Sequence, residues 1–396
     1  MMKLKKPTKK QILEYALIAV VFLSMVVMIF GFYKTEYSYS MYETETRHYV
    51  RGTVTEITDQ ELTLSGADGE YFTGTQNIKV KILEGELKGE TVQINNYITA
   101  QHNVVVNEGR RVIVCADTPK NAEPYFTLYN YDRANSIWIL AAVFVLLVII
   151  VGEKKGLMSC IGLGFTMCTV ICILLPSLYN GGNAALVSIV TVVLSTAVTC
   201  FCISGLSRKT VFNVISACVG TLSAGLIYKI FALILSLSGV SMDEAESLVL
   251  ISQSTGLKLG GVLFAGVMIS ALGAVMDVAV SIGASLFEIR ELNPEITSKQ
   301  LFKSGMNIGK DMIGTMTNTL ILAFAGGSIA TLIVLASYGV QYNQLVSSNY
   351  IALEVAKGLA GSAAVVLTVP ISALVCSFGY AKHKKQNSSQ IKEENQ

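Results

Sequence analysis

Residues 273–327 hold polar side chains inside two stretches that are otherwise apolar. The first stretch carries a carboxylate, Asp277, and the second opens with Asp311, Thr315 and Asn318. Polar side chains cost free energy in hydrocarbon, so where they cluster in membrane helices they usually face the protein interior or a watery pathway. The pattern predicts an internal polar site in a membrane protein, where Asp277 could hold or relay a proton or a cation.

The polar residues of each stretch recur every three or four positions, which places them on one face of a helix. We expect the two faces to pack against each other, because this arrangement removes their polar groups from lipid. The alternative is that Asp277 lies at the inner interface with a structural role only, hydrogen-bonded to Thr315 or Asn318. The predicted pathway residues are Ser270, Asp277, Ser281, Asp311, Thr315, Asn318 and Thr319.

Three further residues are secondary candidates. Glu288 continues the polar face of Asp277, about two turns beyond Ser281. Lys229 lies in another apolar stretch, where it can extend toward the membrane surface or pair with a carboxylate. Pro370 frees a backbone carbonyl and can kink its helix, which suits a moving transporter helix but also occurs in static bundles.

The elements that must position these residues are membrane helices. Hydrophobic residues make up 52% of the 396, and charged residues only 15%, against roughly a quarter in an ordinary soluble domain. The apolar residues fall in blocks long enough to cross the hydrocarbon core, which needs about 20 residues. We expect eight spans, near residues 12–32, 136–151, 157–178, 184–204, 211–237, 259–286, 317–337 and 359–380.

Charge asymmetry predicts the orientation of these spans. Lysine and arginine cluster at both termini and after the second, fourth and sixth spans, whereas the connections 179–183 and 238–256 contain neither. The positive-inside rule then places both termini in the cytoplasm. The first span lacks a following small-x-small cleavage site, so we expect a retained anchor. The prediction is a multi-pass plasma-membrane protein with residues 35–134 outside the cell.

Residues 35–134 have the signals of a small all-β domain. Residues 78–82 alternate between aliphatic side chains and lysine, which gives one buried and one solvated face. Gly85 and Gly89 bracket a hairpin turn, and residues 66–74 have the composition of a loop. We expect an OB-like barrel or a sandwich, with strands at residues 48–57, 61–65, 78–83, 90–95, 111–117 and 125–131.

Other site patterns are weak. Of the eight cysteines only Cys115 lies in the predicted external domain, so we interpret the cysteines as packing residues, with a soft-metal site as the open alternative. His48 and His102 are far apart in sequence and are expected at the surface. The run 305–311 looks like a phosphate loop but lacks one spacer residue and the Ser or Thr after lysine. No cofactor is predicted, and a net charge of +2 gives no indication of a nucleic-acid partner.

The connection between the sixth and seventh spans is predicted to be an ordered hairpin at the inner face. A break at Asn293-Pro294 is followed by a capping box from Thr297 to Gln300. Counting about 20 residues inward from Lys258 places Asp277 near the inner end of the hydrocarbon. We therefore expect an inner vestibule or gate. Small residues four apart, such as Gly256 with Gly260 and Gly266 with Ser270, are expected to allow close helix packing.

The runs GAVMDVAVSI (273–282) and NPEITSKQLFKSGMNIGKDMIGTMTNTLILAFAGG (293–327) make the chain resemble the YibE/F-like family of bacterial multispan membrane proteins. Shorter and weaker matching segments extend the resemblance over nearly the whole chain. It adds Asn307 to the candidate residues and marks Glu288 again. The resemblance implies the membrane topology and locates the family motif in residues 273–327. It does not imply a particular reaction.

Together these observations predict an integral membrane bundle of about eight helices, with an extracellular all-β domain inserted between the first two. We expect a permease-like secondary transporter of undefined substrate, and no enzyme. The alternative is a non-transporting envelope scaffold whose β-domain binds a partner. Expected partners are the bilayer, a second copy or related membrane subunit, and an envelope partner. The expected parts are residues 1–34 (basic terminus and anchor), 35–134 (β-domain), 135–381 (seven-helix bundle) and 382–396 (cytoplasmic tail).

Overall fold

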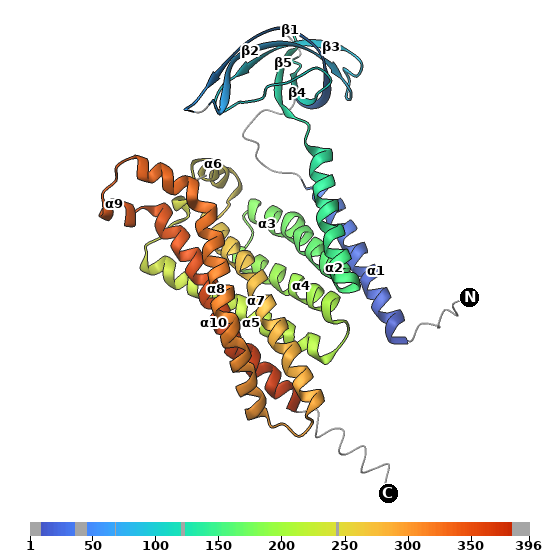
Figure 1. Cartoon of the computed structure of the whole chain (residues 1–396), viewed down its shortest axis with the longest axis vertical. Helices are drawn as coiled ribbons and strands as arrows, with labels where there is room; N and C mark the ends of the chain where they lie inside the picture. The colour runs from blue at the N-terminus through green and yellow to red at the C-terminus, as the bar shows by residue number, and fades with distance from the viewer. Residues whose placement is uncertain (1–8, 36–45, 68, 120–122, 243–244, 382–396) are drawn as a thin grey trace, which may run out of the picture. The chain divides into compact units, whose positions relative to one another are not determined.

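The structure is a computed structural model that describes residues 9–35, 46–67, 69–119, 123–242 and 245–381 (Figure 1). The chain is mostly helical and divides into two compact units. One unit, Ser40–Leu147, contains a β-sheet, and the other comprises Met1–Tyr39 and Val148–Gln396. We call them the sheet unit and the helical unit.

A curled, five-stranded antiparallel sheet with the order β3-β2-β1-β4-β5 forms the sheet unit. Its first strand is long enough to pair with β4 through its first part and with β2 through its second part. Strands β3 and β5 also contact each other, which curls the sheet on itself. The strands are β1 (Arg47–Ser65), β2 (Tyr71–Ile82), β3 (Thr91–Ile98), β4 (Arg111–Asp117) and β5 (Tyr125–Tyr131).

Two details of the sheet differ from the sequence prediction. The expected strands 48–57 and 61–65 are one strand, because the register shifts between Val54 and Glu56 and between Ile57 and Asp59 bend β1 without ending it. Strand β2 begins at Tyr71, inside the segment that was expected to be a loop. The long β1–β2 pairing, which joins Leu64 to Phe72 and Ser65 to Tyr71, extends β2 into this segment.

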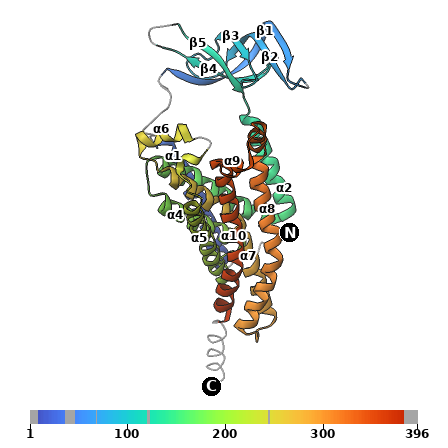
Figure 2. The ribbon, with the colours of Figure 1, turned by 90° about the vertical axis from the view of Figure 1, so that its left-hand side faces the viewer.

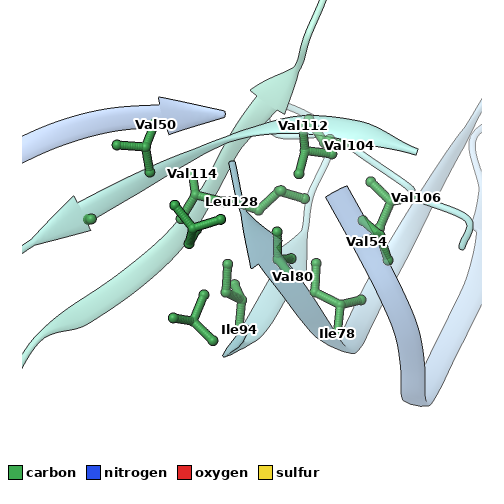
Figure 3. Close-up of a cluster of buried hydrophobic side chains, with 13 residues drawn as sticks. Val50, Val54, Ile78, Val80, Ile94, Val104, Val106, Val112, Val114 and Leu128 are labelled. Atoms are coloured by element: carbon green, nitrogen blue, oxygen red, sulfur yellow. The ribbon is translucent and has the colours of Figure 1, made fainter. Parts of the chain in front are cut away.

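The core of the sheet unit follows from side-chain alternation. Ile78, Val80 and Ile82 are fully buried, as predicted, and Figure 3 shows Ile78 and Val80 within the cluster of buried side chains. Aliphatic side chains from the other strands and from the β3–β4 connection complete a cluster around them. The predicted β2–β3 hairpin is confirmed, with Gly85 and Gly89 at positive φ. Burial of this cluster gives the sheet unit its own hydrophobic core.

Long apolar helices form the helical unit, and the first part of one of them, α2 (Ala134–Thr169), belongs to the sheet unit as far as Leu147. Among the described residues, seven helical segments are long and apolar enough to cross a membrane: Ile12–Tyr33, Ala134–Tyr179, Ala184–Ser204, Arg208–Ile234, Leu259–Leu292, Ser298–Ser337 and Asn349–Tyr380. The helical elements are α1 (Lys9–Tyr33), α2 (Ala134–Thr169), a π-helical turn η1 (Val170–Leu174), α3 (Leu175–Tyr179), α4 (Ala184–Ser204), α5 (Arg208–Ile234), a 3₁₀ turn η2 (Gly239–Ser241), α6 (Ala245–Thr255), α7 (Leu259–Leu292), α8 (Ser298–Ser337), α9 (Tyr342–Val346) and α10 (Asn349–Ala381).

The longest of these segments folds back on itself at Glu153. This residue has φ 49° and ψ −131°, outside the helical region. A Cβ on Gly156 would lie 2.2 Å from the carbonyl oxygen of Val148, although eight residues of continuous helix rise about 12 Å. The segment therefore consists of two helices, which correspond to the predicted spans 136–151 and 157–178. With this division, each of the eight predicted spans has a helical counterpart.

Helix α10 packs against α5, α7 and α8 (Figure 2). Glycines make the closest approaches: a Cβ on Gly309 of α8 would lie 2.1 Å from the Val369 side chain, and one on Gly305 would lie 2.9 Å from Ala373. By contrast, a Cβ on Gly256, Gly260 or Gly266 would meet nothing within 4 Å. The expectation that these small pairs pack helices together is wrong within the single chain.

The hairpin between α7 and α8 is confirmed in detail. Helix α7 ends at Leu292, and α8 begins at Ser298 behind a complete capping box of Thr297 and Gln300. Helix α8 then continues unbroken to Ser337. The segment 238–256, expected to be a connection, contains the short helix α6, in which no described residue is buried.

Candidate functional site: a buried polar cluster in the helical unit

The seven predicted pathway residues lie on the outer surface of the single chain. The exposed residues are Ser270, Asp277, Ser281, Asp311, Thr315, Asn318 and Thr319. Asp277 and Asp311 make no hydrogen bond or ion pair with any described residue. The hydroxyls of Thr315 and Thr319 donate to carbonyls of their own helix, at 3.0 and 2.9 Å. We call this surface of α7 and α8 the outer polar stripe.

The expectation that the two polar faces bury each other is therefore wrong within the chain. The opposite face of α7 carries larger apolar side chains, including Met268, Val275 and Ile282, and these are fully buried. They pack in the helical unit, where α7 contacts α5 and α10. Packing of large apolar side chains decides which face of α7 turns inward, and the small polar face is left outside. A role of the outer polar stripe in a pathway stays a prediction.

The secondary candidates are also peripheral. Lys229 is exposed, and its Nζ lies 5.0 Å from the centroid of the Phe264 ring, so it makes a cation–π contact. Glu288 and Asn307 are exposed. Pro370 is partly buried, and α10 continues through it as one helix.

The most unusual polar residue in the bundle is Asn213 of α5. Its side chain is 0% exposed, and neither Nδ2 nor Oδ1 has a hydrogen-bond partner among the described residues. A buried polar group without a partner costs about 1–3 kcal/mol, and native interiors contain few of them. The amide therefore needs a physical explanation.

The side chain of Asn213 fits against a glycine on the neighbouring helix. A Cβ on Gly283 of α7 would lie 1.9 Å from the Asn213 Oδ1 and 3.4 Å from the Cys376 Sγ of α10. The Cys376 thiol adjoins the hydroxyls of Ser216 and Tyr380, and the Tyr380 hydroxyl donates to the Gly283 carbonyl at 3.0 Å. We call these five residues the inner polar cluster.

Unpartnered hydroxyls extend the cluster along the contact between α5 and α10. Ser216 is fully buried, and apart from the neighbouring Cys376 thiol its hydroxyl has no hydrogen-bond partner in the described chain. A Cβ on Gly220 would lie 2.3 Å from the Thr368 Oγ1, so Thr368 faces α5 two turns before Cys376. Ser372 lies midway between them on the same face, and it is also fully buried and unpartnered.

Aromatic rings close one end of the inner polar cluster. The Tyr380 ring makes edge contacts with Phe212 and Phe287, with centroids 5.6 and 5.5 Å apart. Lys209 lies over Phe287, with its Nζ 5.9 Å from the centroid. These residues belong to the first turns of α5 and the last turns of α7 and α10, so they occupy the end of the bundle nearest Asn213. We call Phe212, Phe287 and Tyr380 the aromatic cover.

A second group of buried hydroxyls lies on α4. Thr191, Ser195 and Thr196 are at most 1% exposed and have no partner among the described residues. The sequence contains a signal for both groups, because Thr191, Ser195 and Thr199 recur at helical spacing, and Asn213 stands in an apolar run as Asp277 does. Our sequence interpretation missed them because single hydroxyls in membrane helices usually bond to their own backbone.

The chemistry available in the inner polar cluster is that of an uncharged binding site. Its amide and hydroxyl groups can donate and accept hydrogen bonds, and their oxygens can coordinate a cation. No group of three or more His, Cys, Asp or Glu side chains in the described part of the chain is placed to hold a metal ion. The amide and hydroxyl groups present have the chemistry to contact a small polar solute or an ion.

A family comparison covers this part of the chain. Residues 140–382 match the family model described as YibE/F-like protein. The match includes α4 to α10 with the inner polar cluster, and also the outer polar stripe. No curated protein and no solved structure gives a significant match. Because the match spans more than half of the 396 residues, the chain belongs to the YibE/F-like family.

Proposed function

We propose that this protein is a permease-like secondary transporter of the plasma membrane, with its solute or ion site at the inner polar cluster. The unpartnered amide of Asn213 carries the proposal. A buried amide that no protein group satisfies is explained when a transported species supplies the missing hydrogen bonds. The long apolar helices and the family membership support a membrane protein.

The proposed topology gives the aromatic cover a role. With both termini cytoplasmic and residues 35–134 outside, the first turns of α5 and the last turns of α7 and α10 lie on the cytoplasmic side. The aromatic cover then separates Asn213 from the cytoplasm, as an inner gate would. Opening requires that Tyr380, at the end of α10, leave Phe212 and Phe287 and break its hydrogen bond to the Gly283 carbonyl.

The sheet unit is proposed to be an OB-like barrel outside the membrane. Pairing of β1 with both β2 and β4, together with the contact between β3 and β5, supports this assignment.

The outer polar stripe is proposed to be covered by a second copy or a related membrane subunit. Such cover would remove Asp277 and Asp311 from lipid, where an uncompensated carboxylate is costly.

The alternative function is a non-transporting envelope scaffold whose sheet unit binds a partner. The observation that favours it is a hollow lined by exposed tyrosines on the sheet unit. In that function the inner polar cluster would only orient α5, α7 and α10. Complementation of a deletion strain by the sheet unit tethered through α1 alone would favour the scaffold and contradict transport.

Proteoliposomes test the transport proposal directly. Purified protein is screened for thermal stabilisation by sodium, potassium, and charged and neutral metabolites at several pH values, and each hit is followed as flux under a proton or sodium gradient. Asn213→Ala is expected to abolish both the stabilisation and the flux. Asn343→Ala is the matched control, since it removes the same amide from an exposed position in α9, outside the inner polar cluster and the outer polar stripe. Equal loss in both variants, or flux that survives Asn213→Ala, would contradict a site at the inner polar cluster.

A further inference from the structure

The outer face of the sheet unit contains a hollow with a volume of about 510 Å³. Side chains of β1, β4 and β5 form most of it, and His102 from the β3–β4 connection adds one wall. Small-ligand sites occupy roughly 300–1,000 Å³, so the hollow has the size of a binding site. It is separate from the inner polar cluster and is not used in the proposed transport.

The strand register explains why these side chains gather. Tyr49 pairs with Cys115, which pairs with Thr127 on the next strand. Side chains alternate along each strand, so the neighbouring Val50 and Val114 point into the core while Tyr49 and Cys115 point outward. The hollow is therefore a built part of the sheet face, carried by three hydrogen-bonded strands.

Three tyrosines give the hollow an aromatic surface. Tyr49, Tyr125 and Tyr129 are 57%, 64% and 55% exposed, although each ring has an apolar face that gains free energy when covered. Tyr49 and Tyr129 meet edge to face, with centroids 4.9 Å apart. This contact holds the two rings in place before any ligand arrives, and a preorganised surface loses less entropy on binding.

A fixed ion pair supplies the polar side of the hollow. The Arg47 Nε lies 3.0 Å from the Asp117 Oδ2, and the Thr46 side chain also hydrogen-bonds to Asp117. The remaining guanidinium N–H groups and carboxylate lone pairs can donate to and accept from a ligand. The hydroxyl of Thr127 lies in the same lining.

Charge and strand pairing narrow the class of ligand. Arg47 is neutralised by Asp117, whereas nucleic-acid binding depends on several cations that neutralise phosphates. An extended peptide binds at a free strand edge through backbone hydrogen bonds, but β4, at the centre of the hollow, pairs with β1 and β5 on both sides. The hollow matches a ligand with flat apolar faces and many hydroxyl groups.

We propose that the hollow binds a carbohydrate. The C–H faces of the sugar rings pack on Tyr49, Tyr125 and Tyr129, and the hydroxyls bond to the Arg47–Asp117 pair. The hollow is expected to take neutral sugars, whose binding changes little with salt because they carry no charge.

The test uses the full-length protein in detergent, titrated calorimetrically with soluble chito-, cello-, malto- and manno-oligosaccharides at 50 and 500 mM salt. We expect one class to bind, Tyr49→Ala and Tyr129→Ala each to weaken binding at least tenfold, and salt to change affinity less than twofold. Tyr97→Ala is the matched control, since Tyr97 is 60% exposed on β3, away from the hollow.

A second variant keeps the test independent of folding. Tyr49→Phe retains the aromatic face and is expected to bind within about threefold of the parent. Failure of all four sugar classes to bind would overturn the proposal, as would equal weakening by Tyr97→Ala. Binding that disappears at 500 mM salt would also overturn it, because it would point to a charged ligand.

Discussion

The close contact between Asn213 and Gly283 gives the sharpest prediction. Gly283→Ala would place a methyl group 1.9 Å from the Asn213 Oδ1, and real Cβ atoms essentially never approach closer than 3.0 Å. One of the two side chains must therefore move by about 1.1 Å inside a packed interior. Overpacking of this kind costs about 1–3 kcal/mol, against a gain of up to about 1 kcal/mol from replacing glycine in a helix.

Helix α7 provides its own control. A Cβ on Gly273 would meet nothing within 4 Å, so Gly273→Ala is expected to be neutral or to stabilise by up to about 1 kcal/mol. The double variant Asn213→Ala with Gly283→Ala removes the oxygen that clashes. We expect the double variant to lose less free energy of unfolding than the sum of the losses in the two single variants. The expected coupling energy is about 1–3 kcal/mol.

The measurement is the free energy of unfolding in mixed micelles, obtained by SDS titration and followed by far-UV circular dichroism. All four variants and the parent protein are compared in the same detergent. If Gly283→Ala behaves like Gly273→Ala, or if the effects at 213 and 283 are additive, the contact between α5 and α7 is not as described. The assignment of Asn213 to the inner polar cluster would then be wrong.

Three further predictions concern other parts of the chain. The predicted proton or cation role of Asp277 requires that Asp277→Asn change the pH dependence of flux or of ligand-induced stabilisation; an unchanged pH profile would remove Asp277 from the mechanism. Glu153 has a positive φ that glycine adopts without strain, so Glu153→Gly is expected to stabilise the helical unit by about 1 kcal/mol, and a loss of stability in the SDS titration would contradict strain there. The Thr46 hydrogen bond and Arg47 lower the pKa of Asp117 below its ordinary value of 3.8. A lowered pKa stabilises the folded state above the unfolded value and loses this effect as pH falls through the folded value, so the stability difference between the parent and Asp117→Asn should be constant above about pH 5 and shrink below pH 4.

Local patterns in the sequence were enough to predict several structural elements. The capping box at Thr297 and Gln300, the break after Leu292 and the hairpin at Gly85 and Gly89 are all confirmed. Each depends on a few neighbouring residues whose backbone and side-chain hydrogen bonds are made locally. The apolar blocks likewise predicted the long helices, because hydrophobic length is a property of composition alone.

Local sequence patterns could not predict which face of α7 is buried. One face offers Ser270, Asp277 and Ser281, the other offers large aliphatic and sulfur-containing side chains, and helical periodicity describes both equally well. The structure buries the larger side chains against α5 and α10 and exposes the polar face. Dispersion and close packing act between helices, so the outcome depends on partners that are distant in sequence.

By itself, the sequence determined the class of the protein, its family resemblance, most of its helices and the alternating core of its sheet, because these depend on local periodicity and hydrophobic length. Only the tertiary structure decided that Asn213, Gly283 and Cys376 meet, and that three tyrosines from β1 and β5 share one hollow. Each of these sites joins residues from separate helices or strands. Their proximity follows from helix packing and strand register, which no local stretch of the chain contains.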